Sequence, residues 1–562
     1  MKWFLPQLVN EVKDCLGPSF PVTTDIPTDQ SAWVAVPVFA VAKKRGQSVE
    51  QIAQEVRAHL ENLEHVSVEI NGGFVNISPT DVSSVIDEAS TTSYGQSEYG
   101  EDARVIVELG GMNVAKPMSI GHLRSTIIGD SLQRLLKDVG YKVTSVNHLG
   151  DWGTQFGKLL VAYQRKFGDL EPRPMTVQDL LDLYVTFHVD VESHPELNDE
   201  ARAKFRRLED GEPAIRKLWQ QFVATSVAEF NAIFDRLGVK LDEPEIGESF
   251  YEPLLNELIA KAKATKVAKE SDGALVIPIP DETAPLMLQK SDGATLYATR
   301  DLATIKYRVE TYHPQKILYA VANEQALHFR QVFAAAKLLD ICPNETELVH
   351  VKFGLVRLPE GKMSTRKGRV VLLNDLLREA ITRARAVVEE KNPELDSTEK
   401  EHVAEVVGIG ALKYFDLSHD RNKDIVFDWD RMLQLTGDSG PYLQYTYVRA
   451  AQILAKAGED ATRTVPLDEW KAGSASKDID RLIRELAMFP LIVEHAANNY
   501  TPHVLAQYLG ELAAQFSRFY EQYPVLTAEG SERPIRLAIV NGVANVLKHG
   551  LNLLGIEVLE RM

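Results

Sequence analysis

Hydrophobic positions follow different periods in successive parts of the chain. Residues 66–77 alternate between apolar and polar side chains around Asn71-Gly-Gly73, the pattern of two strands joined by a tight turn. Apolar residues at helical spacing precede this segment, so residues 1–100 are predicted to form a small α/β domain. Ser, Thr, Gly and acidic residues dominate residues 81–102, and this composition predicts a linker at the end of the small domain.

The pattern then changes to strands that alternate with helices over residues 101–380, which predicts a sheet covered by helices. A mainly helical stretch at about residues 156–285 interrupts this alternation, as an insertion between two halves of the sheet would. Strand patterns nearly vanish after residue 380, and Thr501-Pro502 begins a helix with apolar residues three and four apart. Residues 381–562 are therefore predicted to form an all-α bundle.

A glycine and a histidine stand at the predicted start of a helix in the first half of this sheet. Residues 104–109 have the β-branched density of a strand, residues 122–137 repeat apolar side chains at helical spacing, and residues 141–146 predict a second strand. In such a βαβ unit, the free N–H groups and the positive dipole end of the helix attract phosphate. Gly121 allows a ligand to approach the backbone closely, and His122 can donate a hydrogen bond to a reacting phosphate.

A second candidate phosphate site is Gly361-Lys-Met-Ser-Thr-Arg-Lys-Gly368, after a predicted strand at 351–358 and before a helix that Asn374 could cap. Cationic side chains on this loop could clamp a triphosphate and neutralise departing pyrophosphate. These side chains are Lys362, Arg366, Lys367 and Arg369. Such a cluster alone is equally well explained as a solvated basic turn. Its combination with the first stretch favours a site that handles ATP.

Both stretches resemble the signature motifs of class I aminoacyl-tRNA synthetases, in the form carried by the arginyl-tRNA synthetase family. They read Asn113-Val-Ala-Lys-Pro-Met-Ser-Ile-Gly-His122 and Lys362-Met-Ser-Thr-Arg366. Other segments that resemble this family are Gly150-Asp-Trp-Gly-Thr-Gln155, Ser291-Asp-Gly-Ala-Thr-Leu-Tyr-Ala-Thr-Arg-Asp-Leu-Ala303, Gly437-Asp-Ser-Gly-Pro-Tyr-Leu-Gln-Tyr445 and Leu554-Gly-Ile556. The resemblance therefore runs nearly end to end.

The pattern and the resemblance together predict the fold: an α/β nucleotide-binding (Rossmann-like) catalytic domain with a helical insertion, a small N-terminal α/β domain and an all-α C-terminal bundle. The resemblance implies that the chain joins arginine to its cognate tRNA in two steps through arginyl-adenylate, using ATP and the Mg²⁺ that the nucleotide carries. Residues assigned by resemblance to phosphate stabilisation are His122, Ser119, Lys116, Lys362 and Arg366; those assigned to ATP binding are Gly121, His122, Met363, Ser364 and Lys362. The class pattern has a histidine where this chain has Ser119, and we expect the serine hydroxyl to suffice.

A site for arginine needs acceptors in fixed positions for five planar guanidinium N–H donors. Five residues near the expected carboxyl ends of parallel strands match the substrate-holding positions of the family: Glu108, Asn113, Tyr297, Asp301 and Gln325. By resemblance, Asp301 is the main guanidinium partner, with Asn113 and Glu108 nearer the amino group. From the residues alone, Asp301 could instead cap a helix and Gln325 could be a solvated helix residue. Lysine cannot fill a planar guanidinium site, so we expect the site itself to select arginine over lysine. We therefore expect the insertion to lack hydrolytic function.

Composition limits the partners and the setting. The chain has 80 acidic and 62 basic residues, and its formal net charge of −18 disfavours nonspecific coating of RNA while permitting a local basic track. With only Cys15 and Cys342, we expect neither a disulfide framework nor a protein metal site. No stretch is long and apolar enough to span a bilayer, and acidic residues come too early for a signal peptide. We expect a cytoplasmic monomer that makes no membrane contact.

Contacts with tRNA are predicted at both ends of the chain. By resemblance, the leading domain contacts the elbow of tRNA, and Tyr442, Tyr447, Tyr520 and the chain end at Met562 contact its anticodon region. Core packing is the more frequent role of any one such tyrosine. Two rival functions remain: a class I synthetase for another amino acid, and a catalytically inactive relative that binds RNA as a regulator or assembly subunit.

Overall fold

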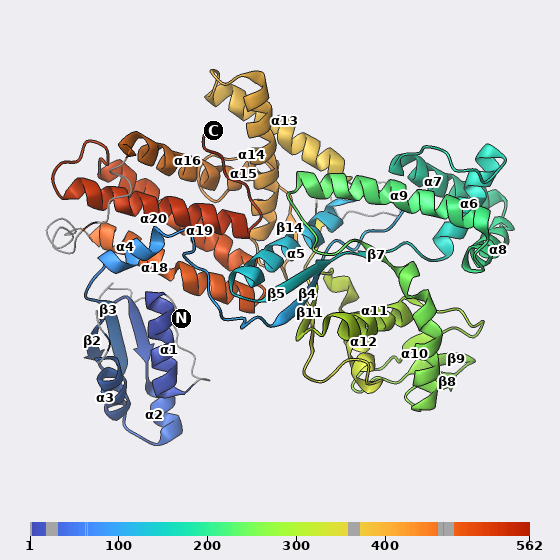
Figure 1. Ribbon diagram of the computed structural model, residues 1–562, viewed down its shortest axis with the longest axis horizontal. Helices are drawn as coiled ribbons and strands as arrows, with labels where there is room; N and C mark the ends of the chain where they lie inside the picture. Colours follow the sequence, from blue (N-terminus) through green and yellow to red (C-terminus); the bar gives the residue numbers. More distant parts are fainter. Residues whose placement is uncertain are drawn as a thin grey trace.

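The computed structural model describes residues 3–17, 32–61, 63, 66–357, 371–458, 465 and 477–562. Lys362, Met363, Ser364 and Arg366 lie outside these described residues. Figure 1 shows a central sheet with the helical bundle on one side of it and the insertion helices on the other. The N-terminal domain packs below the bundle in this view.

The N-terminal domain is a three-stranded antiparallel sheet, ordered β1-β3-β2, that is covered by helices. Its elements are α1 (Phe4–Leu16), β1 (Val34–Pro37), α2 (Phe39–Arg45), α3 (Val49–Leu60), β2 (Val66–Asn71) and β3 (Phe74–Pro79). The predicted hairpin is confirmed, since β2 pairs with β3 from Val66↔Pro79 to Asn71↔Phe74. Gly72, with φ of 60°, supplies the left-handed backbone that the turn between them requires.

The segment predicted as a linker contains a helix, α4 (Ser83–Ala89). Its apolar residues Val85, Ile86 and Ala89 are buried, and the helix packs against α18 (Lys477–Asn498) and α20 (Glu532–Leu553) of the bundle. The linker prediction was therefore wrong here, because a polar composition concealed three residues whose burial depends on a distant part of the chain.

The central domain is built on a parallel sheet ordered β12-β11-β4-β5, with β4 (Arg104–Glu108) between β5 (Lys142–Val146) and β11 (Lys316–Tyr319). Helix α5 (Ile120–Asp138) connects β4 to β5, which confirms the predicted βαβ unit. The other elements are α11 (Tyr297–Tyr312), η2 (Asn323–Gln325), α12 (Ala326–Leu338) and β12 (Glu347–His350). Residues Val105 to Val107 of β4 are at most 1% exposed, which explains the continuous apolar run of this central strand.

The insertion is helical first and then contains a small sheet. Its helices are α6 (Thr154–Phe167), α7 (Val177–Ser193), α8 (Leu197–Glu209), α9 (Pro213–Arg236) and α10 (Glu252–Ala264). Strand β7 (Ile246–Gly247) pairs in parallel with β6 (His148–Leu149) and leads into η1 (Glu248–Tyr251). Strands β8 (Lys269–Ser271), β9 (Ala274–Ile277) and β10 (Leu286–Gln289) form an antiparallel sheet that the periodicity did not predict.

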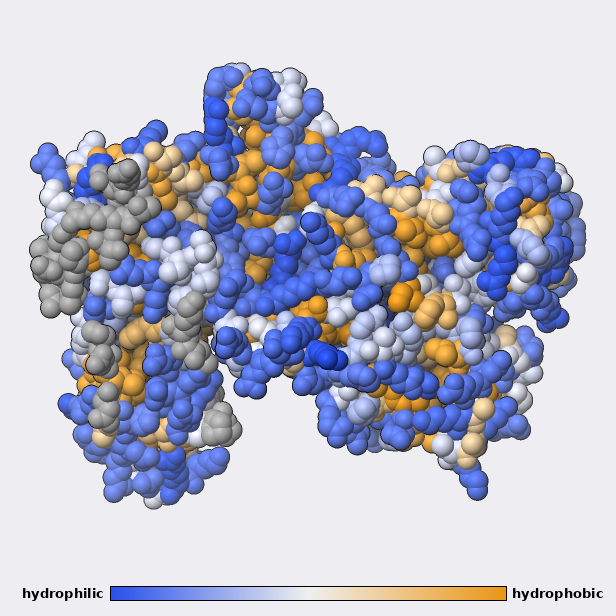
Figure 2. Space-filling view, viewed as in Figure 1, coloured by the Kyte–Doolittle hydropathy of each residue, from blue (hydrophilic) through white to orange (hydrophobic). Residues whose placement is uncertain are grey.

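The last third of the chain is a helical bundle, as predicted. It comprises α13 (Leu373–Lys391), α14 (Ser397–Leu417), α15 (Trp429–Met432), α16 (Gly440–Ala457) and α19 (Pro502–Gln522), with α18 and α20. One short parallel pair, β13 (Val356–Arg357) with β14 (Ile425–Val426), connects the bundle to the segment before residue 358. The face in Figure 2 is mostly hydrophilic, and none of the helices in the described part of the chain is long and apolar enough to cross a membrane.

Buried charged groups hold the bundle against the central domain. Arg124 of α5 is 1% exposed, and its Nε donates to Oδ1 of Asp416 on α14 at 3.2 Å. Its Nη1 donates to the carbonyl oxygens of Gly354 at 2.6 Å and Lys423 at 3.1 Å. Lys413, one turn from Asp416, donates to the carbonyl oxygens of two further segments, at residues 237 and 555. One helix of the bundle is thus held against the helix that carries the first motif.

Candidate active site

Ser119 and His122 cap the start of α5 together. The backbone N–H of Ser119 donates to Nδ1 of His122 at 3.0 Å, and the Ser119 hydroxyl lies 3.0 Å from the same nitrogen. An acceptor at Nδ1 places the proton of the neutral ring on Nε2. His122 therefore presents one N–H donor beside the free N–H groups of the helix start.

The charge state of His122 follows from its surroundings. Burial and the positive charge of Lys116 lower the pKa of His122 to about 4. The ring is neutral at physiological pH, so it stabilises a developing negative charge as a hydrogen-bond donor and not as a cation. Lys116, whose own pKa is lowered by burial and by Lys158, supplies the positive charge.

Residues 371 and 372, which come after the second sequence stretch, contact this helix start. Ser119 forms an antiparallel bridge with Leu372, and the N–H of Ile120 donates to the carbonyl of Val371 at 3.3 Å. The residues that follow the second stretch are therefore fixed beside the first. Gly121 leaves open space here, since a Cβ would meet only the Ser119 hydroxyl, at 3.7 Å. A ligand can approach this backbone closely.

Tyr297 and Asp301 lie one turn apart at the start of α11. Tyr297 is 61% exposed, and Oδ2 of Asp301 lies 2.6 Å from Nε2 of His328 on α12. Asp301 is not a helix cap, because α11 already begins at Tyr297. His328 was missed by the sequence analysis, although its position three residues after Gln325 on a helix start was a usable signal.

The guanidinium and phosphate candidates share one edge of the sheet. The Ser125 hydroxyl, one turn after His122, donates to the carbonyl of Ala320 directly after β11 at 2.5 Å. Gln325 is exposed at the end of η2, a few residues farther along this connection. Asn113 is exposed on the connection after β4 and bridges to Gly150. Asn113 and Gln325 thus follow the carboxyl ends of β4 and β11, and Ser125 of α5 contacts the same edge.

Glu108 has a different position from the one that its predicted role requires. Its carboxylate is buried, and Oε2 lies 2.6 Å from Nη1 of Arg308 on α11. Contact with the amino group of arginine would require this ion pair to open. The sequence could not reveal the pairing, because Arg308 lies 200 residues away on the far end of the helix that Tyr297 begins.

Glu248 is a second carboxylate that the sequence analysis missed. It follows β7 and is 6% exposed, its Oε2 has no hydrogen-bond partner in the described structure, and Nε of Arg300 lies 3.7 Å away. Burial raises its pKa to about 8, against the opposing effect of Arg300 and with a contribution from Asp301. At neutral pH this acid is therefore largely protonated, and a cation bound beside it would favour its ionised form.

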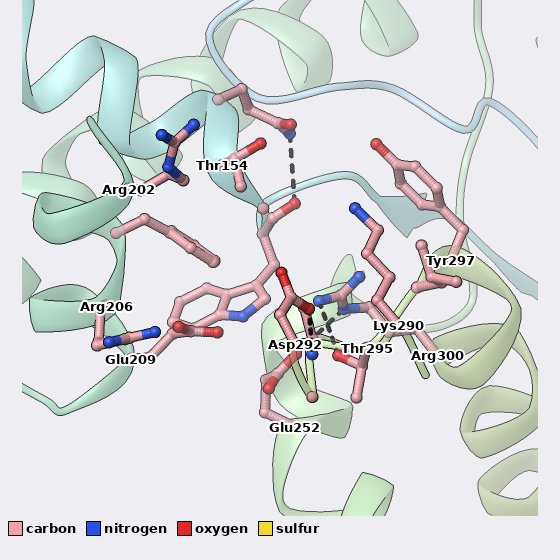
Figure 3. Close-up of a pocket in the computed structure, with 17 residues that line it drawn as sticks. Thr154, Arg202, Arg206, Glu209, Glu252, Lys290, Asp292, Thr295, Tyr297 and Arg300 are labelled. Atoms are coloured by element: carbon pink, nitrogen blue, oxygen red, sulfur yellow. Dashed lines mark hydrogen bonds and ion pairs between the residues drawn. The ribbon is translucent and has the colours of Figure 1, made fainter. Parts of the chain in front are cut away.

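A cavity of about 510 Å³ adjoins these residues. In Figure 3 one wall carries Lys290, Tyr297 and Arg300, and α8 supplies Arg202 and Arg206 on the opposite wall. Tyr297 thus lies between the edge of the sheet and a space bounded by the insertion.

Comparisons with known proteins identify the family. Residues 82–429 match the family described as tRNA synthetases class I (R), catalytic domain, and residues 443–562 match the DALR anticodon binding domain. The arginine–tRNA ligase of Clostridium perfringens (strain 13 / Type A) is 41% identical over 539 residues, which cover 94% of this chain and 94% of the relative. The chain belongs to the arginyl-tRNA synthetase family.

Further relatives agree with this assignment. The arginine–tRNA ligase of Enterococcus faecalis (strain ATCC 700802 / V583) is 39% identical over 539 residues, covering 94% of this synthetase and 93% of the relative. The solved arginyl-tRNA synthetase of Thermus thermophilus superposes with a TM-score of 0.85 at 27% identity, covering 99% of this chain and 100% of that one.

The predicted tRNA-contacting residues of the synthetase differ in exposure. Tyr447 is 8% exposed and packs in the bundle core, as the core-packing alternative predicts. The hydroxyl of half-buried Tyr442 lies 3.0 Å from that of Ser517, and Met562 is half-buried. Tyr520 is 40% exposed, with the guanidinium of Arg449 5.2 Å from its ring centre. Of the three tyrosines, Tyr520 is therefore the most exposed, with Arg449 on its ring.

Proposed function

We propose that this synthetase ligates L-arginine to its cognate tRNA in two steps, consuming ATP and releasing AMP and pyrophosphate. One observation carries the proposal: groups suited to phosphate, His122 and Lys116, and a carboxylate suited to guanidinium, Asp301, converge on the carboxyl edge of one parallel sheet. Family membership supports the same reaction.

In the first step, a carboxylate oxygen of arginine attacks the α-phosphorus of ATP, and the bond from that phosphorus to the pyrophosphate oxygen breaks. Nε2–H of His122 donates to a phosphate oxygen, and Lys116 with the N–H groups at the start of α5 offsets the growing negative charge. Gly121 admits the nucleotide, and Ser119 holds the His122 ring. From the sequence we assign pyrophosphate and nucleotide contacts to Lys362, Met363, Ser364 and Arg366. No general base is required, because the substrate supplies its own nucleophile.

Arginine is recognised by a carboxylate held in a fixed orientation. His328 fixes Asp301 at 2.6 Å, and Tyr297 and Gln325 complete the plane around the guanidinium. Asn113 binds nearer the amino group, while Glu108 holds α11 through Arg308 and so acts as a positioning residue. Lysine would leave the Asp301 carboxylate partly unpaired, at a cost of roughly 3–5 kcal/mol.

In the second step, the terminal 2′-hydroxyl of tRNA attacks the carbonyl carbon of arginyl-adenylate, and AMP leaves. Mg²⁺ would arrive with ATP, whose phosphate oxygens would be its ligands; in the described ranges no group of three His, Cys, Asp or Glu side chains is placed to hold a metal ion. The N-terminal domain contacts the tRNA elbow, and Tyr520 with the chain end contacts the anticodon region. We assign a monomer in the cytoplasm, since one chain supplies all these groups.

A charging assay with purified protein, ATP, tRNA and each of the twenty amino acids tests the proposal. Arginine alone should be charged. Asp301→Asn should lower kcat/KM for arginine by about 10²-fold or more while the KM for ATP stays within about 2-fold, because the change removes the charged guanidinium partner. Asp340→Asn, the same change on an exposed turn, is the control. Charging of another amino acid, or tRNA binding without any charging, would overturn the proposal.

A further inference from the structure

A tight turn of the backbone separates two residues with predicted substrate contacts, Asn113 and Lys116. The N–H of Lys116 donates to the carbonyl of Asn113 at 3.3 Å, and Ala115, the third residue of the turn, has φ of 64°. Turns with positive φ at this position usually have glycine there, because a Cβ disfavours the left-handed backbone. Asn113 and Lys116 are exposed, whereas Val114 and Ala115 are only 1% and 2% exposed. The turn therefore presents the two candidate side chains from a buried base.

Ala115 depends on the protein interior for its unusual backbone. Of the nine non-glycine residues with positive φ in the described part of the chain, Ala115 is the only buried one, so its N–H needs a partner within the protein. That partner is the buried hydroxyl oxygen of Ser226 on α9, which accepts from this N–H at 3.0 Å. The hydroxyl proton of Ser226 is donated to the carbonyl of Phe222 at 2.8 Å, which leaves the oxygen as an acceptor only.

Helix α9 holds Ser226 in a fixed place relative to α5. At the end of α9, the carbonyl of residue 238 accepts from Nη2 of Arg134 on α5 at 2.8 Å, and the carbonyl of residue 237 accepts from Lys413 on α14. These contacts attach α9 both to the helix that begins at the candidate phosphate site and to the bundle. The Ser226 hydroxyl is thereby fixed relative to the start of α5.

The other side of the turn is held independently. Asn113 forms a parallel bridge with Gly150, and the N–H of residue 114 donates to the Gly150 carbonyl at 3.1 Å. Loss of the Ser226 acceptor would therefore release the Lys116 side of the turn and leave Asn113 in place.

We propose that Ser226 is a positioning residue for adenylate formation: its hydroxyl oxygen holds the turn at Ala115 and so sets where the Lys116 ammonium lies relative to His122. This inference rests on the proposed function, which assigns Lys116 to the phosphates. The side chain of Lys116 is long and exposed, so its ammonium is placed only as accurately as the backbone that carries it. Misplacing a group at the reacting centre by about 1 Å can lower a rate by about 10²-fold.

Arginine-dependent pyrophosphate exchange, measured with tRNA present, reports the first reaction step. Ser226→Ala should lower kcat of this exchange by about 10-fold and leave the KM for arginine within about 2-fold, because it displaces Lys116 and spares Asn113. Ala115→Gly added to Ser226→Ala should recover most of the loss, since glycine adopts positive φ without a steric penalty.

A double-mutant cycle separates positioning from a general effect on the fold. Because Ser226 acts through Lys116, Ser226→Ala should change kcat by no more than about 2-fold once Lys116→Gln has removed the ammonium. Thr225→Ala is the matched control: it removes a hydroxyl from the preceding residue of α9, where the partner is Gln221, and should leave kcat within about 2-fold. If Ser226→Ala does not fold, Ser226→Cys, which offers only a weak acceptor, takes its place in the cycle.

Hydrogen–deuterium exchange tests the turn without requiring catalysis. The peptide that spans residues 112–118 should exchange faster in Ser226→Ala than in the wild type, whereas the peptide that spans residues 148–153 should not. Unchanged exchange at Ala115, a wild-type kcat for Ser226→Ala, an equal loss in Thr225→Ala, or the same fold loss with and without Lys116 would each overturn the proposal. A wild-type protein without arginine-dependent pyrophosphate exchange would refute the proposed function, whereas the deuterium measurement would still decide whether Ser226 holds the turn.

Discussion

At the scale of single residues, the pair Ser119 and His122 shows how one histidine can serve where the class pattern has two. The backbone N–H and hydroxyl of Ser119 both approach Nδ1 of His122, so the serine sets the tautomer and orientation of the ring. A second imidazole in its place would have to compete for the same cap. Ser119 therefore acts mainly through His122.

The depressed pKa of His122 makes a prediction about stability. Its pKa falls from 6.5 in an exposed ring to about 4 in the fold, so the unfolded chain binds a proton that the folded chain does not as pH falls through this range. This contribution to stability is fully present above pH 6.5 and is lost as pH falls toward 4. Between pH 8 and pH 5 we expect the loss to be about 2 kcal/mol larger for the wild type than for His122→Asn, measured by urea unfolding. Equal losses in both proteins would contradict the neutral, buried ring.

The bond between His328 and Asp301 makes a second prediction at this scale. His328→Ala removes the group that fixes the carboxylate at 2.6 Å, so Asp301 must be ordered by arginine itself. We expect the KM for arginine to rise about 5- to 20-fold, with kcat and the KM for ATP within about 2-fold. His328→Asn, which can still donate to the carboxylate, should recover part of the loss. Steady-state charging at varied arginine concentration measures the split, and a fall in kcat alone would contradict the assignment.

At the scale of elements, local pattern was enough for part of the fold. Apolar residues recur at a regular spacing in the β4–α5–β5 unit, in the hairpin of β2 and β3 and in the bundle helices. The same spacing predicted where α5 begins, and therefore where its unpaired N–H groups lie. Helix α4 and strands β8 to β10 are too short to show a regular spacing of apolar residues. Their structure depends on burial against distant segments of the chain. The same reason explains why the sequence did not show the buried pairing of Glu108: its partner Arg308 is known only once α11 packs beside β4.

The contact between α5 and α14 makes a prediction at this scale. Arg124→Met keeps most of the side-chain volume but leaves Asp416 buried without its ion pair, which should destabilise the protein by about 3–5 kcal/mol. Replacing both residues, as Arg124→Met with Asp416→Leu, removes the uncompensated charge and should recover more than half of the loss. Urea unfolding of Arg124→Met, Asp416→Leu and the double variant gives the coupling energy. Additive losses would show that the pair is not coupled.

At the scale of the whole molecule, the helix that begins with Ser119 is also the place where the other parts attach. Its start adjoins Val371 and Leu372, its second turn is fixed to α14 through Arg124, and Asp138 at its end contacts His549 of α20. A change in the packing of the bundle can therefore reach the start of α5 through one helix. Sequence motifs predicted the start of α5. They did not show the buried charged groups that attach this helix to the bundle, because those contacts depend on the assembled fold.

The last of these attachments should respond to pH. In His549 of α20, Nδ1 lies 2.7 Å from the carbonyl of Tyr94 and Nε2 lies 2.9 Å from Oδ1 of Asp138 at the end of α5. Two acceptors favour the doubly protonated ring, so although burial lowers the pKa of His549, the bond to Asp138 and its charge raise it overall. Since the folded pKa is above the unfolded one, this stabilisation is complete below pH 6.5 and is lost as pH rises through the folded value.

His549→Gln should therefore lower the thermal unfolding midpoint more at pH 6 than at pH 9, because only at the lower pH does the wild-type ring make a charged contact with Asp138. We expect a difference in stability of about 2 kcal/mol at pH 6 that shrinks toward pH 9. Glu529→Gln, a change at an exposed position of the bundle, is the control for general effects of charge. Because His549 joins the bundle to both α5 and the segment after α4, its deprotonation should also increase proteolytic cleavage near residue 94. A midpoint difference that stays constant across this range would show that the ring is neutral and that the junction does not depend on its charge.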